Sequence, residues 1–122
     1  MAMSGTLDTY LETVYTLSEE SGFVRTTDIS NHLNISKASV NRAVKTLKEH
    51  GYVEHEAYGD VFLTEAGRNK GREIFKRHHI IKKFLVCVLH ISMEQADKEA
   101  MLIEHGIGDR TVYRMSEFMA NV

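Results

Sequence analysis

Apolar and polar positions between Ser36 and Gly51 recur with the period of an α-helix. Val40, Val44 and Leu47 fall on one face at three- and four-residue spacing. The opposite face contains hydrogen-bonding and cationic side chains without an acid: Ser39, Asn41, Arg42, Lys45 and Lys48. Ser36 is a favourable N-cap, and Gly51 suits the left-handed residue that ends a helix. The pattern therefore predicts a helix with one apolar and one cationic face.

A shorter helical pattern precedes it, beginning at Thr26 or Thr27 and including Ile29 and Leu33. Only residues 34–35 separate the two patterns. Two helices joined by so short a turn are typical of a helix-turn-helix, whose second helix enters the major groove of DNA. An ordinary amphipathic helix with a solvated basic face would show the same spacing, so the flanking residues decide between the two.

The flanking residues predict a β-hairpin. Residues 52–57 and 61–63 are strand-like, and residues 58–60 are turn residues. Thr64 can then cap another helix. Helix, turn, helix, hairpin and helix is the order of a winged helix, which we expect over residues 1–70.

Helical patterns account for the remaining chain. We expect a first helix over about residues 7–20, a long helix over about 64–90, another over about 92–105, and a last one capped by Asp109. The expected fold is mainly α with a small β-hairpin: a winged helix-turn-helix followed by an all-α domain over residues 71–122.

The net charge of −2 is unevenly distributed. Residues 25–51 contain five Lys/Arg and two acids, residues 68–83 contain seven and one, and residues 90–122 contain three and six. Phosphate contacts need cations close to the DNA rather than a positive net charge of the whole protein, so the middle of the chain can face DNA.

Composition narrows the class of protein. No apolar run approaches the ~20 residues of a membrane span, and no signal-peptide pattern is present, so we expect a cytoplasmic protein without membrane contact. The single Cys87 excludes an intramolecular disulfide. It lies in the apolar run 84–89, where we expect a buried small hydrophobe. No glycine-rich phosphate loop or recognisable nucleophile is present, so we expect neither an enzyme nor a small organic substrate.

A candidate metal cluster lies near the C-terminus. Four side chains share one face of the predicted 92–105 helix: Asp97, Met101, Glu104 and His105. A thioether, a carboxylate and an imidazole within about one turn suit Mn, Fe, Co or Ni rather than Ca or Mg. Met101 can equally be a core filler, because methionine commonly fills gaps.

Acids and imidazoles recur on two other predicted helices, at Asp8 and Glu12 and at His78 and His79. Each pair lies at the margin of an apolar stripe, where helices meet. A lone histidine on such a stripe is usually a core residue, so His78 by itself is ambiguous. The recurrence on three helices favours a metal site.

Five segments resemble the iron-dependent repressor family, which includes the diphtheria toxin repressor and the manganese-responsive repressors. They are residues 10–15 (YLETVY), 39–44 (SVNRAV), 63–67 (LTEAG), 77–78 (RH) and 103–105 (IEH). The resemblance covers nearly the whole chain and matches the family's shorter members, which have no extra C-terminal domain. It implies a metal-responsive repressor that binds double-stranded operator DNA as a homodimer. The C-terminal half would dimerise and bind metal at the junction of the two halves.

Carried over by position, the resemblance implies four metal ligands: Glu12, His78, Glu104 and His105. Met101 stands where the family has Cys or Glu, and Thr9 stands at a position usually held by Met or Asp, so Asp8 is the neighbouring alternative. Asp97 and Lys82 replace a second-site histidine and carboxylate, so the sequence supports one site well and a second site poorly, and the number of functional sites stays open. Two carboxylates and two imidazoles suit Mn(II) or Fe(II), and also Zn(II). A bound Met101 sulfur would favour Fe(II), Co(II) or Ni(II).

We expect DNA contacts from the early turns of the cationic helix, at Ser36, Lys37, Ser39, Asn41 and Arg42, with Lys45 and Lys48 nearer to phosphate. Dimerisation should use apolar residues after residue 80: Ile81, Phe84, Leu85, Val88 and Leu89. Two other functions stay open: a winged-helix regulator with a degenerate metal site, and more remotely a small metal store or chaperone.

Overall fold

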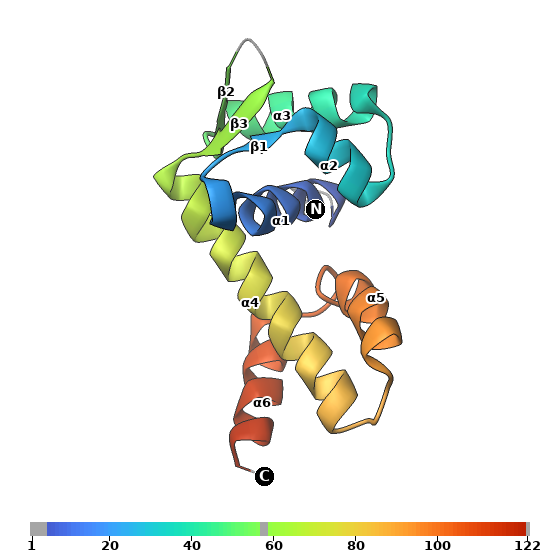
Figure 1. Cartoon of the computed structure of the whole chain (residues 1–122). Helices are drawn as coiled ribbons and strands as arrows, with labels where there is room; N and C mark the ends of the chain where they lie inside the picture. The colour runs from blue at the N-terminus through green and yellow to red at the C-terminus, as the bar shows by residue number, and fades with distance from the viewer. Residues whose placement is uncertain (1–4, 57–58, 122) are drawn as a thin grey trace. The chain divides into compact units, whose positions relative to one another are not determined.

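The computed structural model describes residues 5–56 and 59–121. Within them the chain forms six helices and three strands (Figure 1). In order they are α1 (Gly5–Ser21), β1 (Val24–Arg25), α2 (Thr26–Leu33), α3 (Lys37–Glu49), β2 (Val53–His55), β3 (Asp60–Leu63), α4 (Glu65–Cys87), α5 (Met93–Ile103) and α6 (Asp109–Ala120). The chain divides into two compact units, Met1–Ile74 and Phe75–Val122. This division falls within α4. The domain boundary expected after residue 70 also falls within α4, and it stays a prediction.

The predicted helix-turn-helix is present as α2 and α3. Asn34 ends α2 in the left-handed conformation with φ of 55°, which asparagine tolerates better than most residues. The Ser30 hydroxyl donates to the Ile35 carbonyl at 2.6 Å across the turn. Ser36 caps α3 as predicted, because its Oγ accepts the Ser39 N–H at 3.1 Å. The local sequence thus determines both ends of the turn.

The predicted hairpin is extended by a strand that the sequence pattern does not indicate. The sheet order is β1-β3-β2, with both pairings antiparallel. Val24 pairs with Val61, and Arg25 pairs with Asp60. Two residues are too few to show the alternation from which a strand is predicted. Within the described residues, the expected strand over residues 52–57 is observed as Val53–His55. Residue 57 of that strand and residue 58 of the expected turn lie outside the described residues.

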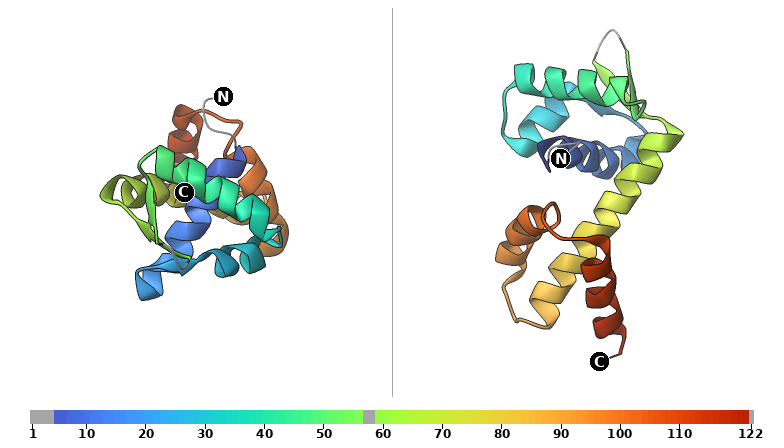
Figure 2. Two further views of the ribbon diagram at one scale, coloured as in Figure 1. Left: turned by 90° about the horizontal axis from the view of Figure 1, so that it is seen from above. Right: turned by 180° about the vertical axis from the view of Figure 1, so that it is seen from behind.

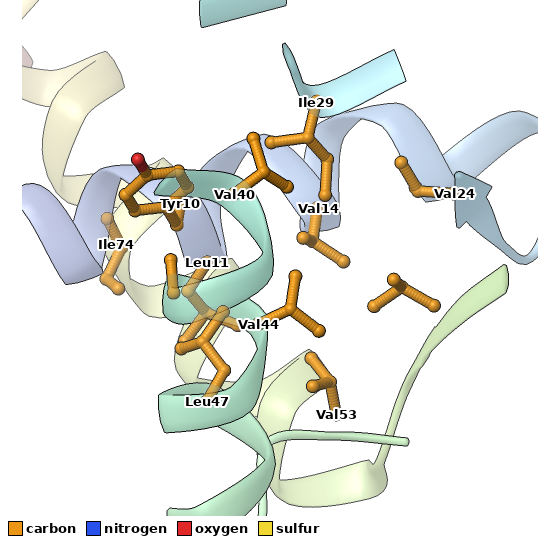
Figure 3. Close-up of a cluster of buried hydrophobic side chains, with 12 residues drawn as sticks. Tyr10, Leu11, Val14, Val24, Ile29, Val40, Val44, Leu47, Val53 and Ile74 are labelled. Atoms are coloured by element: carbon orange, nitrogen blue, oxygen red, sulfur yellow. The ribbon is translucent and has the colours of Figure 1, made fainter. Parts of the chain in front are cut away.

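A single apolar cluster fills the first unit (Figure 3). α1 contributes Tyr10, Leu11 and Val14, and α3 contributes Val44 and Leu47, all of them buried. The cluster also includes side chains from α2, α4 and all three strands: Val24, Ile29, Val53, Val61 and Ile74. The cationic helix α3 is therefore anchored through the apolar face that its sequence predicts.

Thr64 and Gly67 join the hairpin to the start of α4. The Thr64 hydroxyl donates to the Gly51 carbonyl at 2.6 Å and accepts the Gly67 N–H at 3.0 Å, which confirms the predicted N-cap. A Cβ on Gly67 would lie 1.8 Å from the Tyr52 carbonyl oxygen. Glycine is needed because α4 passes directly against the backbone that follows α3.

The second unit is built on the C-terminal half of α4, which α5 and α6 flank (Figure 2). Its core contains five buried residues: Ile81, Leu85, Ala96, Ala100 and Val112. Ala96 and Ala100 are four residues apart, so both lie on the same face of α5, the one that joins this core. Ser92 caps α5 as predicted, with its Oγ accepting the Gln95 N–H at 3.2 Å.

The two predicted helices of the second unit are present: α4 ends at Cys87, expected at about residue 90, and α5 ends at Ile103, expected at about residue 105. Two other expectations about this unit are wrong. Asp109 begins α6 but does not cap it, because its carboxylate binds Arg77 at 2.6 Å and Gly108 occupies the cap position. Cys87 is exposed rather than buried, since the helix turns Ile81 and Leu85 to the core instead. No helix among residues 5–56 and 59–121 is long and apolar enough to cross a membrane.

Candidate nucleic-acid interface and metal centre

The first turns of α3 form a small hydrogen-bonded group on the surface of the first unit. The Ser36 hydroxyl donates to Ser39 Oγ at 3.0 Å. Arg42 Nη2 donates to the same Ser39 oxygen at 3.2 Å. A guanidinium has five N–H donors, more than this contact uses. Arg42 is therefore held against the helix and retains donors for a ligand.

The other predicted DNA-contacting side chains are exposed on the same helix: Lys37, Asn41, Lys45 and Lys48. Glu49 is the only acid in α3, and it is the last helical residue. The helix therefore presents a cationic surface along its length. Base contacts by Arg42 and Asn41, and phosphate contacts by Lys45 and Lys48, stay predictions.

His78 is the centre of a polar cluster within the second unit. It comes from α4, is buried, and contacts two carboxylates with its two ring nitrogens. Nδ1 lies 2.5 Å from Glu104 Oε1. Nε2 lies 2.9 Å from Asp97 Oδ1. The side chain is thus buried with both ring nitrogens paired, so its role as a metal ligand stays a prediction.

Glu104 carries a buried carboxylate oxygen that needs a partner. Its residue is 3% exposed, and Oε2 makes no hydrogen bond within the described part of the chain. His105 Nε2 lies 3.9 Å from this oxygen, which is beyond hydrogen-bonding distance. A buried anionic oxygen without a hydrogen bond is costly. The carboxylate, with imidazoles on both sides, fits a divalent transition metal.

Asp97 and Lys82 lie on the other side of the His78 ring. Lys82 Nζ is 3.4 Å from the same Asp97 oxygen that contacts His78. The hydrogen bond from His78 is the main cause that holds the pKa of the Asp97 carboxyl below its ordinary value; burial opposes it, and the charge of Lys82 adds a smaller lowering effect. Asp97 is therefore an anion held between two donors.

Arg77 fixes the segment that carries Glu104 and His105. Its Nε donates to the Glu104 carbonyl at 2.8 Å, its Nη1 binds Asp109 at 2.6 Å, and its Nη2 donates to the Ile107 carbonyl. Glu104 is the C-cap of α5, and its N–H still donates to the Ala100 carbonyl at 2.9 Å, whereas His105 follows the helix. The three Arg77 contacts therefore hold the segment just beyond the helix end.

The structure brings together three of the predicted metal residues: His78, Glu104 and His105. Asp97, expected only as a helix-face neighbour, is a direct partner of His78. Met101 is 37% exposed, so it is not a core filler, and its role as a ligand stays a prediction. Asp8 and Glu12 belong to α1 in the first unit, and their ligation also stays a prediction. The Arg77 contacts had one sequence signal, the Arg-His pair, which does not show what the arginine binds.

The first unit is a winged helix with a cationic recognition helix, and the second is a helical unit with a histidine–carboxylate cluster. The chain belongs to the iron-dependent repressor family: residues 2–61 match the family's N-terminal DNA-binding domain, and residues 64–122 match its metal-binding and dimerisation domain. It is a transcriptional regulator rather than an enzyme.

Curated relatives agree with this membership. The chain is 35% identical to an uncharacterized HTH-type transcriptional regulator of Methanocaldococcus jannaschii, covering 96% of this chain and 94% of the relative. It is 29% identical to the HTH-type transcriptional regulator MntR of Geobacillus kaustophilus, covering 93% and 79%.

Solved structures share the fold. The crystal structure of IdeR from Thermoplasma acidophilum is 27% identical with a TM-score of 0.83, covering 93% of this chain and 53% of that one. A manganese-dependent transcriptional repressor in complex with manganese is 27% identical with a TM-score of 0.86, covering 93% and 52%. This chain thus spans about half the length of these two structures.

Proposed function

We propose that this protein is a homodimeric repressor that binds operator DNA when Mn(II) or Fe(II) occupies a site containing His78, Glu104 and His105. The observation that carries the proposal is the buried Glu104 oxygen without a hydrogen bond, beside two imidazoles. The iron-dependent repressor family model and the similar structure of a manganese-dependent repressor in complex with manganese support these two metals. We place its action in the cytoplasm, as for a regulator with a DNA-binding domain.

Each residue of the site has a separate task. Glu104 supplies the buried carboxylate, and His78 and His105 supply neutral imidazole nitrogens. A divalent cation bound there would compensate the negative charge of the buried Glu104 carboxylate. Arg77 holds the segment with Glu104 and His105 in place.

We propose Glu12 of α1 as a further ligand, on the support of the family resemblance. A carboxylate from the DNA-binding unit would make metal affinity depend on that unit, and DNA affinity depend on metal, because linkage is reciprocal. In a dimer this coupling would favour one spacing of the two α3 helices, about 34 Å for half-sites one turn apart. Met101 and Asp8 are the further candidates for this shell, and a Met101 sulfur would favour Fe(II) over Mn(II).

The second copy should cover the groove between α4 and α6. A cavity of about 540 Å³ there is lined by His79, Ile80, Lys83, Cys87, Val88, Ser116, Met119 and Ala120. Phe118, exposed at 53%, packs edge-on against Phe84, with ring centroids 6.2 Å apart. Of the residues expected to dimerise, Ile81 and Leu85 are instead buried in the unit's own core. Phe84, Val88 and Leu89 stay in the proposed surface.

The test is DNA binding with and without metal. Duplexes selected from a random pool by the Mn(II)-loaded protein provide the probe, and fluorescence anisotropy measures affinity. Mn(II) or anaerobic Fe(II) should tighten binding at least about tenfold, which corresponds to ~1.4 kcal/mol. His78→Ala and His105→Ala should lose this response.

His90→Asn is the matched control. His90 is exposed, outside the cluster, and has φ of 60°, a conformation that asparagine tolerates. It should keep the full metal response. If both His78→Ala and His105→Ala still responded to metal, the metal site would be wrong. DNA binding equally tight without metal would support the regulator with a degenerate site.

A further inference from the structure

The Asp97 carboxylate contacts a metal-site histidine and a lysine at once. Asp97 Oδ1 lies 2.9 Å from His78 Nε2 and 3.4 Å from Lys82 Nζ. His78 and Lys82 are four residues apart on α4, so both reach the same point on α5. The Asp97 side chain is 51% exposed and that of Lys82 is 26% exposed. The contact therefore lies at the rim of the second unit, outside the buried Glu104 carboxylate.

The two nitrogens of His78 have different surroundings. An imidazole that binds a metal through one nitrogen keeps its proton on the other, and a carboxylate commonly accepts that N–H. Nδ1 faces the buried Glu104 carboxylate, whose second oxygen makes no hydrogen bond within the described residues. Nε2 faces Asp97, which already has a cation beside it. The Lys82 ammonium repels a divalent cation on the Asp97 side.

We propose that Asp97 is a positioning residue that keeps the His78 proton on Nε2, so that Nδ1 would bind the metal and release to solvent the proton that it shares with Glu104 Oε1 at 2.5 Å. Lys82 holds Asp97 in this role and prevents the carboxylate from acting as a ligand itself. The centre then takes one divalent cation per protomer, on the Glu104 side of the ring. This inference rests on the proposed metal site and adds which nitrogen binds and which residues stay outside the coordination shell.

The geometry disfavours the opposite assignment. Binding through Nε2 would place the cation beside Lys82 and would direct the Nδ1 proton to Glu104. The Glu104 oxygen without a hydrogen bond would then keep no cationic partner. Because that oxygen is the buried one, the Glu104 side is the better place for positive charge.

NMR of the full-length protein loaded with Zn(II) tests the assignment directly. Zn(II) is diamagnetic, so long-range ¹H–¹⁵N correlations of ¹⁵N-histidine report which ring nitrogen is protonated and which is metal-bound. His78, assigned by its loss in His78→Gln, should show a protonated Nε2 and a metal-bound Nδ1. A metal-bound Nε2 would overturn the proposal.

Mn(II) titration followed by electron paramagnetic resonance tests the positioning role. Asp97→Ala should weaken Mn(II) binding about 10- to 100-fold, the usual effect of removing such an outer partner. Asp97→Asn keeps an acceptor oxygen and should lose less. The stoichiometry should stay at one Mn(II) per protomer in the wild type and in both variants.

Glu94→Gln is the matched control, because Glu94 is an exposed acid of α5 that pairs with Lys98 at 3.8 Å. It should bind Mn(II) as the wild type does. Unchanged affinity in Asp97→Ala, or two Mn(II) ions per wild-type protomer, would contradict the inference while leaving a metal-dependent repressor intact. Wild-type protein that binds no Mn(II) or Zn(II) would overturn the proposed function as well.

Discussion

The two units bury apolar side chains to different extents. The first unit has a cluster of 12 buried residues, which includes Leu11, Ile29 and Leu47 at 0% exposure. The core of the second unit has five, and two of them are alanines. All the large hydrophobic residues found exposed in the described structure belong to the second unit: Leu89, Met93, Met101, Leu102, Tyr113 and Phe118.

The difference indicates how each unit is stabilised. A domain of about 50 residues buries a smaller fraction of its surface than a larger domain does and is marginally stable, so a bound metal or a partner subunit adds a significant share of its stability. The second unit has both a cluster suited to a metal and exposed apolar side chains suited to a second copy. The first unit has a core sufficient to position α3 by itself. DNA recognition therefore depends on the first unit, whose core is complete within one chain. We expect its regulation to depend on the second unit, which a metal and a second copy of the chain would stabilise.

The largest effect should come from truncating the first core. Leu47→Ala removes a side chain that is 0% exposed, and we expect a loss of about 2–5 kcal/mol in the free energy of unfolding. Urea denaturation followed by circular dichroism measures it. Lys48→Ala, on the exposed face of the same turn, should change stability by less than about 0.5 kcal/mol. Equal losses in the two variants would mean that this core does not determine the stability of the unit.

An intermediate effect should come from the surface that we assign to the second copy. Phe118→Glu places a charge in an apolar contact and should weaken dimerisation by about 2–4 kcal/mol, as for an interface hot spot. Sedimentation velocity over a range of protein concentrations measures the dissociation constant.

Leu102→Glu is the control for that experiment. Leu102 is 77% exposed on α5, and α5 contributes no residue to the groove between α4 and α6. This variant should dimerise normally. Dissociation caused by Leu102→Glu but not by Phe118→Glu would move the interface to α5.

The smallest effect should come from the DNA-contacting face of α3. Arg42→Ala should lower affinity for the selected duplex by about 1–3 kcal/mol if Arg42 reads a base, with little change on random DNA. Lys45→Ala should weaken binding to both and reduce its salt dependence. Anisotropy titrations at several salt concentrations measure these quantities. Equal loss on both duplexes in Arg42→Ala would assign that residue to phosphate instead.

The sequence by itself determined the elements whose signals are local. The apolar face of α3, its Ser36 cap and the Thr64 cap each depend on residues within a few positions, and the structure confirms all three. The family was also recognisable, because its motifs are short segments at fixed separations. Helical spacing and the recurrence of acids and imidazoles on three predicted helices make His78, Glu104 and His105 candidate ligands, and the family segments add to them.

Only the tertiary structure decided the features that depend on distant partners. The two-residue strand β1 is too short for a pattern and exists because it pairs with β3. Cys87 lies in an apolar run but is exposed, since the helix can direct only one face to the core. Arg77, Asp97 and Lys82 acquire their tasks from contacts across 15 to 32 residues of sequence. Periodicity predicts which side of a helix is apolar, whereas packing alone decides which polar groups meet at its edge.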